Sequence, residues 1–301
     1  MNGSTGTVFD IGYQRYTGAR EGRNRALLAV YKDGIRAALG LGRGGRALIL
    51  PWFFIAVLAI IALIMAIVAG AAERMIGPGA AQQANLPLHH DYYAIASMII
   101  FVFAAVVAPE LLCRDRREGV INLYLVRPLT SSDYLIARFA AFLTVMSVTL
   151  WVPQFILYLG LSGGDPTPLT YVKNHWMDVP RFLVAGFVMA GYVTTLAMLT
   201  ASFTTRRAFA AVFLVGLFAI TAPFTLGLSQ EIGGKVGQWM SMFSLTNIPL
   251  HVSDIIFDES SELTREAPAQ QLGPRVLSIW YVIWTFVPAL FLWWRYRRLS
   301  A

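Results

Sequence analysis

Six long apolar runs constrain this chain more than any other feature. Each is long enough to cross a hydrocarbon core about 30 Å thick as a helix that rises about 1.5 Å per residue. Helices suit this environment because they satisfy their own backbone hydrogen bonds. The runs occupy residues 49–70, 92–113, 136–160, 181–203, 208–229 and 276–294. We therefore expect an all-α membrane protein with six transmembrane helices.

Basic residues are distributed unevenly between the two sets of connecting segments. Of the 24 Lys and Arg residues, 18 precede the first run, follow the last run or lie in or beside the second and fourth connections, with Arg138 counted beside the second; the other six lie in or beside the remaining connections, with Arg181 counted beside the third. Because Lys and Arg accumulate on the cytoplasmic side, both termini are expected to be cytoplasmic. The net charge of +7 is then explained by orientation and by contact with anionic membrane lipid, so we expect no nucleic acid partner.

The chain before the first run divides into two parts. Residues 1–22 indicate a flexible cytoplasmic N-terminus, and residues 23–48 indicate an amphipathic interfacial helix followed by a hinge. An apolar face at helical spacing beside a basic edge is typical of a helix that lies in the membrane interface. Residues assigned to this helix include Arg25, Tyr31, Lys32, Ile35 and Arg36.

The glycine-rich hinge at 40–45 matches a dinucleotide-binding fingerprint by letter only. It follows a basic helix and leads into an apolar run, whereas that fingerprint requires a preceding strand. We therefore interpret it as a flexible connection.

The remaining residues, 49–301, form the expected six-span domain. Two of its connecting loops have sequence patterns that indicate more than a simple link between spans. The inner loop 114–135 contains both leucines and arginines. It is expected to form a short helix that ends at Pro128, and a new helix is expected to begin at the capping-box pattern of Thr130 and Asp133. Such an apolar knob with a charged rim is suited to docking on a soluble partner. The outer loop 230–275 contains an apolar stretch, Trp239 to Leu250, too short to span, which predicts a re-entrant or interfacial helix.

The inner loop resembles the signature of type-2 ABC exporter permeases, the membrane subunits of ATP-driven transporters. In that family an acidic residue, a glycine, a leucine-rich stretch, a proline and a tyrosine-containing helix start follow one another. The matching positions here are Asp115, Gly119, Ile121, Leu123, Leu125, Pro128, Ser131 and Tyr134. One departure is Arg138, where a lysine is frequent; either cation could meet lipid headgroups.

The resemblance implies a permease subunit in a bacterial-type cytoplasmic membrane. Two copies of the permease would assemble with two cytoplasmic ABC ATPase subunits that bind ATP and Mg. This chain would hold no cofactor or metal and would not be an enzyme by itself, consistent with its lack of a phosphate-binding GxxxxGK[ST] loop. The implied ATPase-coupling residues are Asp115, Arg117, Glu118, Gly119, Leu123, Leu125, Arg127 and Pro128.

Several weaker signals leave alternatives open. Glu110, near the inner end of the second run, predicts a local ion pair with Arg114 or a gating role, because ionisable groups in membranes are costly. The acidic outer loop predicts either a solvated segment or a contact with a cationic substrate or an outer accessory protein. A membrane-embedded enzyme such as a lipid transferase would have to use Asp115, Glu118 and Asp133. An assembly factor for another membrane complex is the remaining alternative.

Overall fold

The computed structural model describes residues 22–42, 44–77, 79–119, 129–165 and 167–298. Six of its helices are long and apolar enough to cross a membrane, which confirms the predicted all-α, six-span architecture. Each extends a few residues beyond the apolar run that predicted it. They are α2 (Gly45–Ile76), α4 (His89–Arg117), α6 (Ser131–Gly164), α8 (Asp178–Phe203), α9 (Arg207–Ile232) and α13 (Pro274–Arg297).

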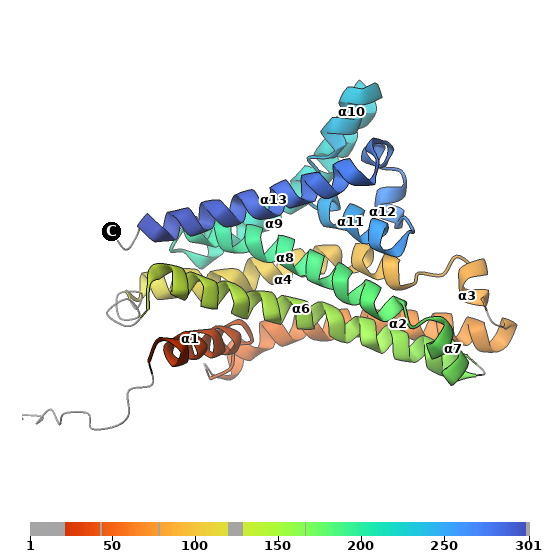
Figure 1. The fold of residues 1–301 in the computed structure, drawn as a ribbon, viewed down its shortest axis with the longest axis horizontal. Helices are drawn as coiled ribbons and strands as arrows, with labels where there is room; N and C mark the ends of the chain where they lie inside the picture. Colours follow the sequence, from red (N-terminus) through yellow and green to blue (C-terminus); the bar gives the residue numbers. More distant parts are fainter. Residues whose placement is uncertain (1–21, 43, 78, 120–128, 166, 299–301) are drawn as a thin grey trace, which may run out of the picture.

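The six long helices lie side by side with the short elements gathered at the two ends of the bundle (Figure 1). Helix α1 (Gly22–Ala38) and the end of α13 lie at one end, called here the α1 end. The opposite end, called the α11 end, carries α3 (Ala80–Gln83), α7 (Pro168–Asn174), α11 (Asn247–Phe257) and α12 (Glu262–Arg265). An even number of crossings thus brings both ends of the described chain to the same side.

Small residues allow α2 and α6 to approach closely. A Cβ added to Gly160 would collide with the side chain of Ala66, and one added to Gly164 would lie 2.5 Å from the Cα of Gly70. Gly160 and Gly164 are four residues apart on α6, and Ala66 and Gly70 are four residues apart on α2. Residues at this spacing lie on the same face of a helix. In a membrane, where apolar side chains gain little by leaving lipid, such close backbone packing is a main source of helix association.

Helix α1 packs against the first half of α6. Its buried positions Val30, Gly34, Ala37 and Ala38 form one stripe, and a Cβ on Gly34 would lie 2.6 Å from the Cβ of Ala141. The Tyr31 hydroxyl lies 3.0 Å from Thr144 Oγ1. The helix ends at Ala38, and the hinge that follows is a tight turn in which Gly40, Gly42 and Gly44 all have positive φ. These backbone angles explain the glycines, because residues with a Cβ adopt them at a cost.

The segment between α9 and α13 contains α10 (Gly234–Ser241), α11, α12 and a 3₁₀ helix, η1 (Pro268–Leu272). The apolar stretch Trp239 to Leu250, in the segment predicted to hold re-entrant or interfacial helices, is divided between α10 and α11. Tertiary hydrogen bonds hold the intervening turn: Tyr192 Oη donates to Leu245 O at 2.8 Å, and Thr246 Oγ1 donates to Phe218 O at 3.2 Å. As a result α11 turns back against α8 and α13, whereas α10 projects away from the bundle (Figure 1).

Packing of α11 buries His251, which is 2% exposed. Within the described residues neither ring nitrogen has a hydrogen-bond partner. Burial lowers the pKa of His251 to about 4 because the charged form loses its hydration. The folded state therefore binds a proton at this site less readily than the unfolded chain, whose histidine titrates near pH 6.5.

Acidification should consequently destabilise the α11 end of the fold. A histidine with a lowered folded pKa contributes nothing above pH 6.5, and its protonation in the unfolded chain costs about 2 kcal/mol of unfolding free energy by about pH 5. Thermal unfolding in detergent, followed against pH, should show a smaller loss for His251→Leu than for the unmodified protein. Burial also raises the pKa of Asp254 on the same helix, with the opposite effect, and the comparison isolates His251. Identical pH slopes in the two proteins would contradict the assignment.

Cysteine labelling should separate the two ends of the bundle. Thr170 in α7 and Thr205 between α8 and α9 are both exposed, and the native Cys113 is buried, so the unmodified protein is the control. With the predicted orientation, Thr170→Cys should react with an impermeant maleimide in intact cells, and Thr205→Cys only after permeabilisation. The reverse pattern would overturn the orientation derived from the basic residues.

Candidate functional site: an arginine-centred brace at the α1 end

Arg138 is the centre of a buried ion cluster that joins three helices. It lies on α6 and is 1% exposed. Its Nη2 lies 2.6 Å from Asp115 Oδ2 on α4, and its Nη1 lies 2.9 Å from Asp33 Oδ2 on α1. We call Asp33, Asp115, Tyr134 and Arg138 the brace. A guanidinium with fixed, forked donors suits such a junction, because it can hold two carboxylates in defined directions.

Tyr134 extends the brace to a fourth helix. Its hydroxyl donates to Asp115 Oδ2 at 2.7 Å, so this oxygen accepts from both Tyr134 and Arg138. The Tyr134 ring stacks on Tyr296 of α13 with ring centroids 6.3 Å apart. Charges removed from water are costly unless they are paired and hydrogen-bonded. Arg138 and Asp115, which are both buried, therefore require each other.

A second ion pair fastens the start of α1 to the start of α6. Arg23 donates to both carboxylate oxygens of Asp133, at 3.0 and 2.8 Å. Asp133 also accepts from the backbone N–H of Thr130, whose hydroxyl oxygen accepts from the Asp133 N–H, as in a capping box. The pKa of Arg23 is raised by its hydrogen bond to Asp133. The predicted cap is thus confirmed, and the same carboxylate also binds α1.

Further contacts tie the end of α4 to α8 and α9. Arg116 donates to Ser202 O, and Cys113 Sγ donates to Thr204 O at 3.2 Å. Glu110 forms an ion pair with Arg207 at the start of α9, and Arg114 forms one with Glu118 at 3.1 Å. Glu110 therefore joins two spans, where the sequence predicted a contact within its own helix.

Glu110 also borders a cavity of about 640 Å³ at the α1 end. Its walls come from the glycine hinge, the start of α2, the end of α4 and the start of α9. Two ion pairs face apolar side chains there, so the cavity offers both charged and hydrocarbon-like surface. The residues that line it include Leu50, Pro51, Val106, Val107, Glu110, Arg114, Glu118 and Arg207.

The structure describes only some of the other residues predicted to take part in coupling. Arg117, Glu118 and Gly119 are exposed at the end of α4, and Gly119 has a φ of +68°. Leu123, Leu125, Arg127 and Pro128 lie outside the described residues. On the predicted interfacial helix, Tyr31 and Ile35 are half-buried, and Arg25, Lys32 and Arg36 are exposed.

Sequence reasoning missed two members of the brace. Arg138 was expected to meet lipid headgroups, but it is buried by its own chain and neutralised by carboxylates. Asp33 was not singled out, although it is the only acidic residue between positions 22 and 48. A lone carboxylate in a basic helix was the available signal, because such a group is retained most readily where it has a buried cation to pair with.

Neither a protein-family model nor a curated protein sequence matches this chain. The structure by itself establishes six helices able to span a membrane and a polar cluster at one end of them.

The two carboxylates on Arg138 provide a matched test of the brace. The Asp115 side chain is 10% exposed and that of Asp33 is 56% exposed. Breaking a buried pair leaves an uncompensated charge, so Asp115→Ala should lower the unfolding free energy by about 3 kcal/mol. Asp33→Ala should cost less than about 1 kcal/mol, because water can replace an exposed partner. Chemical unfolding of the purified protein measures both, and equal effects would show that Arg138 is not the buried centre of the cluster.

Proposed function

We propose that the chain is the membrane-spanning permease subunit of an ATP-driven exporter. Two copies form the substrate pathway, and each binds a cytoplasmic ATPase subunit that supplies the ATP and Mg site. The short connection between α4 and α6 docks on that ATPase. Nucleotide-driven movement of the connection then passes into the bundle.

The brace is the observation that carries this proposal. The connection runs from Glu118 to Thr130, and both of its attachment points are tied together within two turns: Asp115 before it binds Tyr134 and Arg138 after it. A force applied to this connection reaches α4 and α6 simultaneously, and reaches α1 through Asp33. Coupling between sites requires an element whose position both of them bias. A loop clamped at both ends by a buried ion cluster has that property.

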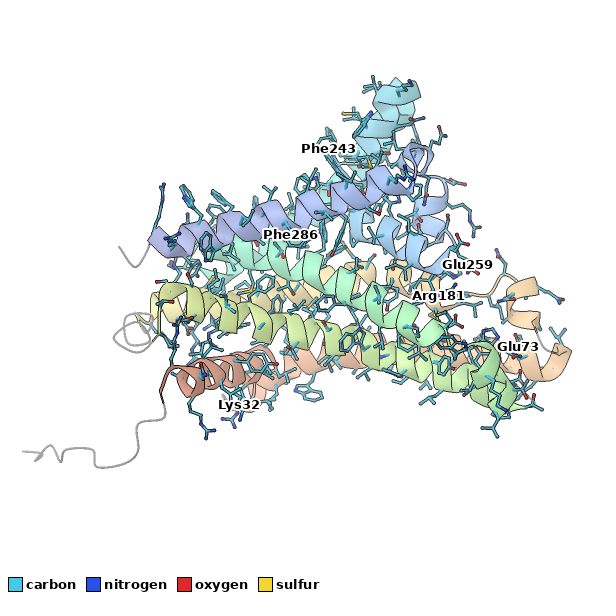
Figure 2. The ribbon with its side chains drawn as sticks, in the orientation of Figure 1. Lys32, Glu73, Arg181, Phe243, Glu259 and Phe286 are labelled. Carbon is cyan, nitrogen blue, oxygen red and sulfur yellow. The ribbon has the colours of Figure 1, made fainter. Side chains whose placement is uncertain are left out.

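The uncovered helix faces support an assembly with a second copy. In their most apolar windows, only 22% of α9 and 11% of α13 is buried, against 67% of α4 and α8. Phe286, in the middle of α13, is 59% exposed (Figure 2). Lipid or a second permease can cover these faces. The proposal assigns part of this surface to the second copy.

An embedded transferase is less well supported, because each of its candidate carboxylates is engaged by an arginine. Asp115 binds Arg138, and Asp133 binds Arg23. Glu118 binds Arg114. Carboxylates held in this way are poor general bases and are not arranged to share a ligand. An assembly factor would use the same surfaces without an ATPase, so the nature of the co-purifying subunit distinguishes it.

Purification of the tagged chain in mild detergent tests the proposal directly. We expect a nucleotide-binding subunit to co-purify in equal amount and to supply all ATP hydrolysis. Leu123→Ala and Leu125→Ala should reduce its retention, since burying a leucine contributes about 1.5–3 kcal/mol. Leu169→Ala is the matched control, because Leu169 is 80% exposed on α7 at the opposite end. ATP turnover by the pure chain, or full retention by both leucine variants, would refute the proposed coupling.

A further inference from the structure

A second cavity, of about 820 Å³, opens at the α11 end. Three segments form it: the turn after α3, the first turns of α4, and the connection from α11 to α12. Glu259, on this connection, lies at the end of the molecule opposite Lys32 of α1 (Figure 2). The side chains that line the cavity include Gln82, Asn85, Leu86, His90, Asp91, Ile95, Glu259, Leu263 and Arg265. Its size is in the usual range for sites that take small organic molecules.

His90 lies between two carboxylates that come from different segments. Its Nε2 is 3.1 Å from Asp91 Oδ2, and its Nδ1 is 2.8 Å from Glu259 Oε2. A neutral imidazole donates from one nitrogen only, whereas the imidazolium donates from both. At these distances both carboxylates form ion pairs with the ring only when each of its nitrogens carries a proton. The positively charged ring of His90 then links α4 to the α11–α12 connection.

The walls of the cavity are held by buried polar contacts. Asp254, which is 6% exposed, accepts hydrogen bonds from the Ser261 backbone N–H, from Gln270 Nε2 and from the Thr264 hydroxyl. These bonds fix the connection that presents Glu259. On the opposite wall, His89 Nδ1 and Gln154 Oε1 lie 2.6 Å apart, and Gln154 Nε2 donates to His89 O at 3.0 Å.

The charges in the cavity favour a cationic ligand. The ionisable groups near His90 are His89 and Asp91 on its own helix and Asp254, Glu259 and Arg265 from the α11–α12 side; α3 and the turn after it contribute the neutral Gln82 and Asn85. With His90 neutral, the carboxylates outnumber the single arginine. Apolar side chains such as Leu86, Ile95 and Leu263 lie beside them. Such a site selects ligands by their charge at the carboxylates and by their apolar contacts with the side chains around them.

We propose that this cavity binds an organic cation that carries an apolar substituent, and that its positive head replaces the proton of His90 between Asp91 and Glu259. Binding and protonation of His90 are then mutually exclusive. The site is complete within one chain, so it does not depend on the ATPase or on the proposed transport function. The ligand and the proton stabilise the same link between α4 and the α11–α12 connection.

Benzyltrimethylammonium is a suitable probe, because its charge is permanent at every pH. Its neutral carbon isostere, neopentylbenzene, has nearly the same shape. Titration calorimetry on the full-length protein in nanodiscs should detect the cation and not the isostere. Because the proton is proposed to compete with the cation, affinity should fall at least about threefold when the pH is lowered from about 8 to about 5.5. Equal binding of both probes, or affinity independent of pH, would overturn the proposal.

Three variants, expected to weaken, strengthen or leave unchanged the affinity for the cation, complete the test. Glu259→Gln should weaken cation binding about tenfold, because an ammonium loses its carboxylate partner. Arg265→Gln should strengthen it, since the competing positive charge is removed; a variant that merely failed to fold could not give this result. Glu266→Gln is the matched control, because Glu266 is exposed directly after α12 and does not line the cavity. Unchanged affinity in both Glu259→Gln and Arg265→Gln would contradict the assigned site.

Discussion

A buried guanidinium constrains much of this structure. Arg138 cannot be left unpaired in an apolar bundle, because an isolated charge there would cost several kcal/mol. Its two carboxylates come from α1 and α4, so the helix before the first span must lie beside α6, and the end of α4 must return to the start of α6. The amphipathic helix is thus held against α6 by its buried apolar stripe and, in addition, by the ion pair between Asp33 and Arg138.

Close packing makes this cluster mechanically useful. Gly34 allows the backbone of α1 to approach Ala141, and Gly160 and Gly164 allow α2 to approach α6 in the same way. Helices at such short separation have few alternative packings, since interiors of this density are not continuously deformable. Displacement of the α4–α6 connection should therefore move α1, α4 and α6 together. That rigidity is what a coupling role requires, and an exposed, solvated loop would not provide it.

The two ends of the bundle differ in the residues that pair with their carboxylates. At the α1 end the charges are paired through arginines, which stay protonated at any physiological pH. At the α11 end a histidine, His90, lies between the carboxylates of Asp91 and Glu259. The ion pairs at the α1 end are suited to holding α1, α4 and α6 together at all times. The α11 end is suited to a response to a small cation or to pH.

The sequence by itself determined the class and the order of the elements. Apolar runs long enough to cross a bilayer have one stable solution, so the six spans could be located from composition and length alone. The cap formed by Thr130 and Asp133 was also predictable, because it depends on residues three positions apart. Only the tertiary structure decided the partners of Arg138, the division between α10 and α11, and the bridge from His90 to Glu259. Each of these joins residues that are distant in the chain or depends on hydrogen bonds from another helix, and local pattern carries no information about which segments meet.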